Sequence, residues 1–143
     1  MIDFEPVKFL IVDDDEVSVI KIKRAIAKAK LGNPVRVAND GIEALEILRG
    51  DGGQEKITPP YIVTLDINMP RMDGHEFLQE IRNDTRLKNV LVFVLTTSSN
   101  EADIRAAYDR NVAGYILKEN SESDLIDKIN MIENFSNLVV LPK

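Results

Sequence analysis

The feature that most constrains this chain is a set of five short apolar segments, each followed by a helical pattern. The segments lie at residues 8–12, 35–37, 61–65, 90–95 and 114–118. Residues 10–12 and 90–95 are apolar without alternation, which is typical of strands buried on both faces of a sheet. Strands that alternate with helices predict a parallel sheet with right-handed crossovers and helices on both faces. The pattern therefore predicts an α/β fold with a doubly wound, five-stranded parallel sheet.

Capping and turn residues mark where the five expected helices begin. Asp73 followed by Glu76 is typical of a capping box, and Gly32-Asn33-Pro34 ends the first helical pattern. The segment 50–60 is rich in glycine and proline and predicts a surface loop longer than most connections in compact domains. The other expected helix starts lie near Asp15, Asn39–Gly41, Asn100 and Ser121.

Composition limits the function classes. A length of 143 residues fits a single domain, 1–143, for which we expect a core over residues 8–135 and a tail over 136–143. The chain has no cysteine, one histidine and a net charge of −6. These values disfavour disulfides, a zinc site and binding to a nucleic-acid backbone. No apolar stretch is long enough for a membrane span and no signal peptide is visible, so we expect a cytoplasmic protein.

Polar side chains follow four of the apolar segments at the point where each ends. Asp13 and Asp14 follow the first, Asp66 the third, Thr96 the fourth and Lys118 the fifth. In an open parallel sheet, ligands bind beyond the carboxyl ends of the strands. Three carboxylates at one edge repel one another unless a cation joins them, and Mg²⁺ suits oxygen ligands of this kind. A lysine and a hydroxyl beside them are donors that a phosphoryl group needs.

Each of these residues also has a plain structural explanation. Asp13 or Asp15 could cap a helix, Thr96 could satisfy a turn, and Lys118 could be a solvated surface lysine. Their coincidence at one edge of the expected sheet favours a single site with Asp66 at its centre.

The motifs at these positions resemble the receiver domain of two-component response regulators. The resemblance spans residues 8–135 and implies a flavodoxin-like fold with strand order 2-1-3-4-5. It rests on Ile11-Val-Asp-Asp14, Asn39-Asp-Gly-Ile-Glu-Ala-Leu45, Leu65-Asp-Ile-Asn-Met-Pro-Arg-Met-Asp-Gly74, Val94-Leu-Thr96 and Gly114-Tyr-Ile-Leu-Lys118.

The resemblance implies a chemical role for the aspartates. Asp66 would be the phosphoacceptor, attacking a phosphohistidine on a sensor histidine kinase. Asp13, Asp14, Asp66 and the backbone carbonyl of Asn68 would hold Mg²⁺.

The resemblance also implies a switch. Lys118 would pair with the phosphoryl oxygens, while Thr96 and Tyr115 would respond together to phosphorylation. Asn68 and Ser98 would tune the lifetime of the phosphoryl group.

Finer features resemble the stand-alone regulators that partner phytochromes. They are the long loop before the third strand, Leu95-Thr-Thr-Ser98 with Ala107-Tyr108 downstream, and the sequence that ends Val139-Val-Leu-Pro142. They imply a kinase of the phytochrome type and no attached output domain, so we expect signalling through protein contacts. The apolar tail suggests a docking surface or a homodimer surface.

One departure from the family pattern, one single histidine and two alternative functions remain. Glu119 stands where most receivers have a proline after the lysine, which leaves the position of Lys118 open. His75 is expected to be a solvated residue in the first turn of its helix. A phosphohydrolase of the haloacid-dehalogenase type would want a second carboxylate at position 68, where this chain has Asn68. A degenerate receiver would not need the combination of Asp66, Thr96 and Lys118.

Overall fold

The chain forms a five-stranded parallel sheet between two layers of helices. The computed structural model describes residues 6–28, 32–118 and 121–142. The strand order is β2-β1-β3-β4-β5, so the predicted flavodoxin-like topology is confirmed. The elements are β1 (Lys8–Val12), α1 (Glu16–Lys28), β2 (Val35–Ala38), α2 (Gly41–Arg49), β3 (Tyr61–Leu65), α3 (Gly74–Asn83), β4 (Val92–Thr96), α4 (Glu101–Asp109), β5 (Gly114–Leu117) and α5 (Glu122–Leu138).

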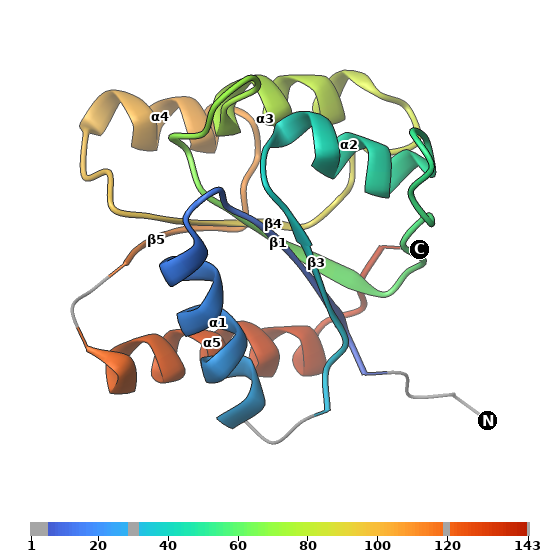
Figure 1. The fold of residues 1–143 in the computed structure, drawn as a ribbon. Coiled ribbons are helices and arrows are strands. Elements are labelled where there is room, and N and C mark those ends of the chain that lie inside the picture. The colour runs from blue at the N-terminus through green and yellow to red at the C-terminus, as the bar shows by residue number, and fades with distance from the viewer. Residues whose placement is uncertain (1–5, 29–31, 119–120, 143) are drawn as a thin grey trace.

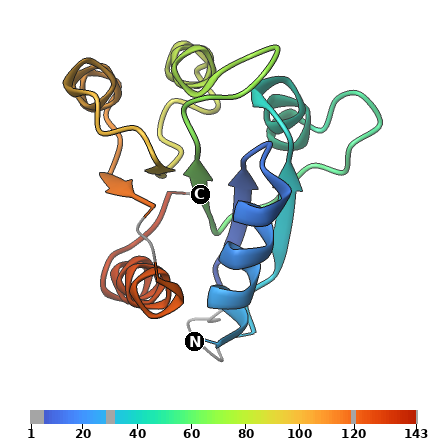
Figure 2. The same cartoon turned by 60° about the vertical axis from the view of Figure 1, so that its left-hand side comes forward.

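The helices divide between the two faces of the sheet, as Figures 1 and 2 show. Helices α1 and α5 cover one face, where Phe9, Ile22 and Ile129 belong to one buried cluster. Helices α2, α3 and α4 cover the other face, where Leu48 and Phe77 belong to the second cluster. Because both faces are covered, the strands are apolar on both sides.

Side-chain caps start the helices where the sequence predicted them. Asp73 and Glu76 form both hydrogen bonds of a capping box at α3. At α1, the carboxylate of Asp15 accepts hydrogen bonds from the Val17 amide (3.1 Å) and the Ser18 hydroxyl (3.1 Å). Asp15 is therefore the cap of α1, which leaves Asp13 available for the site. Asp40, Asn100 and Ser121 cap α2, α4 and α5.

Some element boundaries differ from the sequence-based prediction. β4 begins at Val92 and includes Thr96, because this stretch pairs in register with β3 and β5. Lys118 lies just beyond β5, which ends at Leu117. Helix α5 continues to Leu138, into the segment expected to be a tail, since nothing in this stretch breaks a helix before Pro142.

The long loop between α2 and β3 folds back onto the end of α2. Gly50 ends the helix in the left-handed conformation (φ 76°). The amides of Asp51 and Ile57 donate to the carbonyls of Glu46 (2.9 Å) and Ile47 (3.1 Å). The loop is therefore built into the fold through its own backbone.

Two expectations concern features outside the sheet and its site. Among the described residues, no helix is both long and apolar enough to cross a membrane. Glu119, which departs from the family pattern, lies outside the described residues.

Candidate functional site

The backbone at Asp13 and at Asp66 is held by hydrogen bonds that continue the pairing of the strands. Val12 pairs with Leu65 in the parallel register of β1 and β3, so the residues that follow them lie side by side. The Asp13 amide donates to the Ala38 carbonyl (3.0 Å), and the Asp66 amide donates to the Val12 carbonyl (2.9 Å). The sheet geometry thus fixes the backbone at both carboxylates.

Three carboxylates gather at this edge. One oxygen each of Asp13, Asp14 and Asp66 lies within 4.8 Å of the others. Asp13 is buried at 2% exposure and Asp66 at 9%, whereas Asp14 is exposed. We call Asp13, Asp14, Asp66 and Lys118 the acidic edge.

Lys118 brings one positive charge into this group. Its Nζ lies 2.6 Å from Asp13 Oδ2 and 3.5 Å from Asp66 Oδ2, and it also donates to the Ser18 hydroxyl (3.2 Å). The Lys118 amide donates to the Thr96 carbonyl (2.7 Å), which ties the start of the following loop to β4. Lys118 is therefore a partly buried partner of the carboxylates and not a solvated surface lysine.

The electrostatics leave negative charge uncompensated. Burial raises the pKa of Asp13, and the charge of Asp66 adds to this effect, while Lys118 and the Asp15 amide act in the opposite direction. Three carboxylates facing one lysine are an oxygen-only donor set with excess negative charge. That is the chemistry a hard divalent cation requires.

Thr96, Ser98 and Tyr115 lie next to one another on the β4–α4 side. The Ser98 amide donates to the Thr96 hydroxyl (3.3 Å), and the Tyr115 hydroxyl donates to the Ser98 carbonyl (2.8 Å). Thr96 is fully buried at the end of β4. Burial raises the pKa of Tyr115, although the bond to Ser98 opposes this. The structure therefore places these three predicted switch and tuning residues together.

Asn68 lies in the β3–α3 loop, and the structure shows two features that hold this loop. The Gly74 amide donates to the Ile67 carbonyl (2.8 Å). Arg71 adopts a left-handed backbone (φ 61°), and its Nε donates to Asp40 Oδ2 (2.6 Å). Asn68 itself is exposed.

The ion pair between Arg71 and Asp40 was not predicted. Burial tends to raise the pKa of Asp40, but the hydrogen bonds from Arg71 and the Glu43 amide outweigh it and hold the pKa below its usual range. The sequence marks Asp40 as a turn and cap residue, but it carries no signal for a partner 31 positions away.

The expectation of a solvated His75 is wrong. His75 Nε2 lies 2.8 Å from Asp103 Oδ1, and the Ser98 hydroxyl donates to Asp103 Oδ2 (2.6 Å). The side chains of His75 and Asp103 are 24% and 27% exposed, because α3 and α4 pack side by side. Asp103 thus joins the start of α3 to the loop that follows Thr96.

Comparison with known proteins identifies the family. Residues 9–130, most of the chain, match the sequence profile of the response regulator receiver domain. The chain belongs to this family. It is therefore a receiver of two-component signal transduction, as the motifs predicted, and receiver domains are generally signalling proteins that bind a divalent metal at an aspartate cluster.

Similar proteins include response regulators that this chain covers over most of their length. Response regulator Rcp1 of Synechocystis sp. is 32% identical over 130 residues, which cover 91% of this chain and 88% of Rcp1. The crystal structure of the phosphorylated cyanobacterial phytochrome response regulator RcpA has a TM-score of 0.88 and 36% identity, covering 97% of this chain and 100% of RcpA. The Mn²⁺-bound form of Rcp1 has a TM-score of 0.85 and 32% identity, covering 96% of this chain and 100% of that one.

Proposed function

We propose that this receiver accepts a phosphoryl group on Asp66 from the phosphohistidine of a sensor histidine kinase. A carboxylate oxygen of Asp66 attacks phosphorus, the new O–P bond forms as the N–P bond breaks, and the electron pair stays on the kinase imidazole. The observation that carries the proposal is the position of Asp66. It directly follows β3, is 9% exposed, and has Lys118 Nζ 3.5 Å from its Oδ2.

The residues around Asp66 fit the binding of Mg²⁺. Asp13, Asp14, Asp66 and the backbone carbonyl of Asn68 would hold the ion, which when bound neutralises charge on the carboxylates and on the phosphoryl oxygens. The raised pKa of Asp13, caused mainly by burial, supports this proposal because a cation would relieve the uncompensated charge.

Lys118 and Thr96 supply the donors for the new phosphoryl oxygens. Lys118 Nζ already faces both Asp13 and Asp66, so it needs to move little to pair with a phosphoryl group on Asp66. The Thr96 hydroxyl at the end of β4 would turn toward the added charge. Because Ser98 lies between Thr96 and Tyr115, that movement would reach the exposed side of α4 and β5.

The expected partner is a kinase of the phytochrome type. The similarity to RcpA, described as a cyanobacterial phytochrome response regulator, supports this assignment. Leu138 and Val140 are 83% and 95% exposed, which is consistent with the homodimer expected from the apolar tail. That dimer and the cytoplasmic location stay predictions.

We do not expect multiple turnover of phosphate esters. The position two residues after Asp66 holds Asn68, whose amide cannot act as the general acid that a dehalogenase-type phosphohydrolase needs. The receiver should lose its own phosphoryl group slowly, at a rate that substitutions at Asn68 and Ser98 change.

The decisive experiment is phosphorylation by acetyl phosphate with Mg²⁺, followed by intact-mass spectrometry. The wild type should gain one phosphoryl group, and Asp66→Asn should gain none. Asp109→Asn is the matched control, since Asp109 is an exposed carboxylate at the end of α4. Labelling that persists in Asp66→Asn would refute the assignment of the phosphoacceptor.

A further inference from the structure

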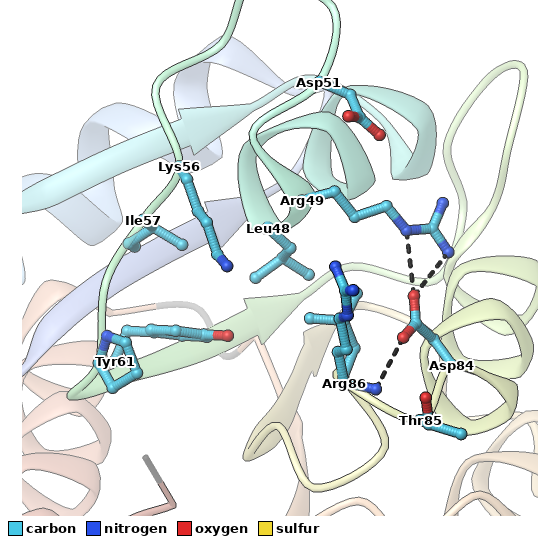
Figure 3. Close-up of a pocket in the computed structure, with 11 residues that line it drawn as sticks. Leu48, Arg49, Asp51, Lys56, Ile57, Tyr61, Asp84, Thr85 and Arg86 are labelled. Atoms are coloured by element: carbon cyan, nitrogen blue, oxygen red, sulfur yellow. Dashed lines mark hydrogen bonds and ion pairs between the residues drawn. The ribbon is translucent and has the colours of Figure 1, made fainter.

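A cavity of about 420 Å³ lies at the edge of the sheet opposite the acidic edge, beside the start of β3. Figure 3 shows it between the end of α2, the α2–β3 loop and the segment that follows α3. Buried apolar side chains of Leu48, Ile57 and Leu87 form part of its lining. Its volume is within the range of small-molecule sites, which is roughly 300–1,000 Å³.

Three hydrogen-bond donors line this cavity without a protein partner. Lys56 Nζ, the Tyr61 hydroxyl and the Arg86 guanidinium make no hydrogen bond or ion pair within the part of the chain that the structure describes. Figure 3 shows the Lys56 amine and the Tyr61 hydroxyl pointing into the space in front of Leu48, with Arg86 across from them. We call Lys56, Tyr61 and Arg86, with this apolar lining, the basic cavity.

The carboxylates nearby do not neutralise these donors. Asp84 accepts from Arg49 Nε (3.2 Å) and, through its other oxygen, from the Arg86 amide (2.8 Å). Asp51 lies at the outer end of the cavity in Figure 3, away from Lys56 and Arg86. The lining therefore holds three basic side chains and two carboxylates, in a protein whose net charge is −6.

Lys56 belongs to the long α2–β3 loop, which forms one wall of the cavity. This loop has no part in the proposed phosphorylation of Asp66. A Cβ at Gly50 would lie 2.9 Å from Lys56 Cβ, so the loop returns in close contact with the end of α2. The loop also receives a hydrogen bond from Arg36 to the Gln54 side chain (3.4 Å). Binding residues are often found on loops that a rigid scaffold positions.

We propose that the basic cavity binds a small organic phosphate, a phosphate monoester attached to an apolar or aromatic body. A dianionic phosphate has three terminal oxygens, which match one ammonium, one guanidinium and one hydroxyl donor. The apolar part of the lining, with Leu48 and Leu87, accommodates the body of the ligand. The proposal is independent of phosphorylation at Asp66, because the two sites lie at opposite edges of the sheet.

The test is an NMR titration of amide signals with AMP, and separately with inorganic phosphate, in EDTA so that metal does not recruit phosphate to the acidic edge. AMP should cause saturable shifts at Lys56, Tyr61 and Arg86, and inorganic phosphate should bind more weakly because it lacks the apolar body. Lys56→Ala and Arg86→Ala should each weaken AMP binding about tenfold, the loss expected for one charge-assisted hydrogen bond. Tyr61→Phe should weaken it less, and higher salt should weaken it in every case.

Lys23→Ala is the matched control, since Lys23 is an exposed cation on α1, away from the cavity. Lys56 and Arg86 are exposed, so their removal should leave the melting temperature unchanged, and Arg86→Gln retains the side-chain stem if Arg86→Ala does not fold. The proposal is overturned if neither probe gives saturable shifts at the cavity. Equal AMP affinity in the Lys56→Ala/Arg86→Ala double variant, or binding of an acidic peptide without binding of AMP, would also overturn it.

Discussion

The two edges of the sheet differ in charge and in how they are built. At the carboxyl ends of the strands, Asp13 and Asp66 sit one residue beyond regular β-structure, and Lys118 lies 2.6 Å from Asp13. At the opposite edge, Lys56 and Arg86 come from irregular segments, and their charged groups have no protein partner among the described residues. A rigid backbone positions the acidic edge, whereas the basic cavity depends on how a loop packs. Substitutions should therefore affect the two edges unequally.

The largest effect is expected from Gly74→Ala beside the acidic edge. A Cβ there would lie 2.5 Å from the Asp66 carbonyl oxygen and 2.9 Å from Ile67 Cα, which are backbone atoms that cannot turn away. The free energy of unfolding should fall by about 3 kcal/mol, the upper range for overpacking. Chemical denaturation measures this loss, and labelling by acetyl phosphate should slow because the backbone at Asp66 is displaced.

Gly53→Ala is the comparison at the other edge. Gly53 has φ 80° and open space around its Cβ position, so only the left-handed backbone opposes alanine, at about 1 kcal/mol. Labelling at Asp66 should be unchanged in this variant. If Gly53→Ala destabilised the protein as much as Gly74→Ala, the acidic edge would not be the more rigid of the two.

A smaller effect is expected at Asp40, which joins α2 to the loop after Asp66. Asp40→Ala removes the cap of α2 and the partner of Arg71, so the free energy of unfolding should fall by about 1.5 kcal/mol. Asp40→Asn keeps a side chain that can cap α2, so comparison with this variant measures the contribution of the Asp40 charge alone.

The effect of this charge should depend on pH. The pKa of Asp40 is lowered in the folded protein, so its ionised form contributes stability above the ordinary value of 3.8. That contribution is lost as the pH falls through the folded-state value. Chemical denaturation should be measured for wild type and Asp40→Asn from neutral to acidic pH. The difference between their free energies of unfolding should shrink below pH 3.8, and a constant difference would contradict a role for the Asp40 charge.

The smallest effect is expected at Asp103, which links His75 to Ser98. The Ser98 hydroxyl and then His75 lower the pKa of Asp103, so its stabilising contribution is present above pH 3.8 and is lost in acid. Because the pair is partly exposed, Asp103→Asn should cost only about 0.5 kcal/mol at neutral pH.

The more specific readout is the mobility of Tyr115, whose hydroxyl donates to the Ser98 carbonyl. Its aromatic NMR signals should broaden in Asp103→Asn and not in Asp109→Asn, which removes an exposed carboxylate from the same helix. Unchanged Tyr115 signals would show that the contacts of Asp103 on α4 do not restrict the motion of Tyr115.

Sequence patterns located the acidic edge because each of its residues follows a short apolar segment that forms a strand. Asp66 is next to Leu65 in the chain, and the parallel register that brings Asp13 beside it follows from the strand pattern. His75 could not be placed in this way. Its position in the first turn of α3 is local information, but its partner Asp103 comes from a separate helix.

The sequence by itself determined the fold class, the family and the set of side chains at the carboxyl ends of the strands. Strand burial, helix caps and strand ends are short-range properties, so neighbouring residues encode them. Only the tertiary structure decided that Arg71 binds Asp40, that His75 lies against Asp103, and that Lys56 and Arg86 face one cavity. These contacts join residues from different elements. The packing of the helices and the path of the α2–β3 loop fix the distances between them, and no local sequence signal predicts either.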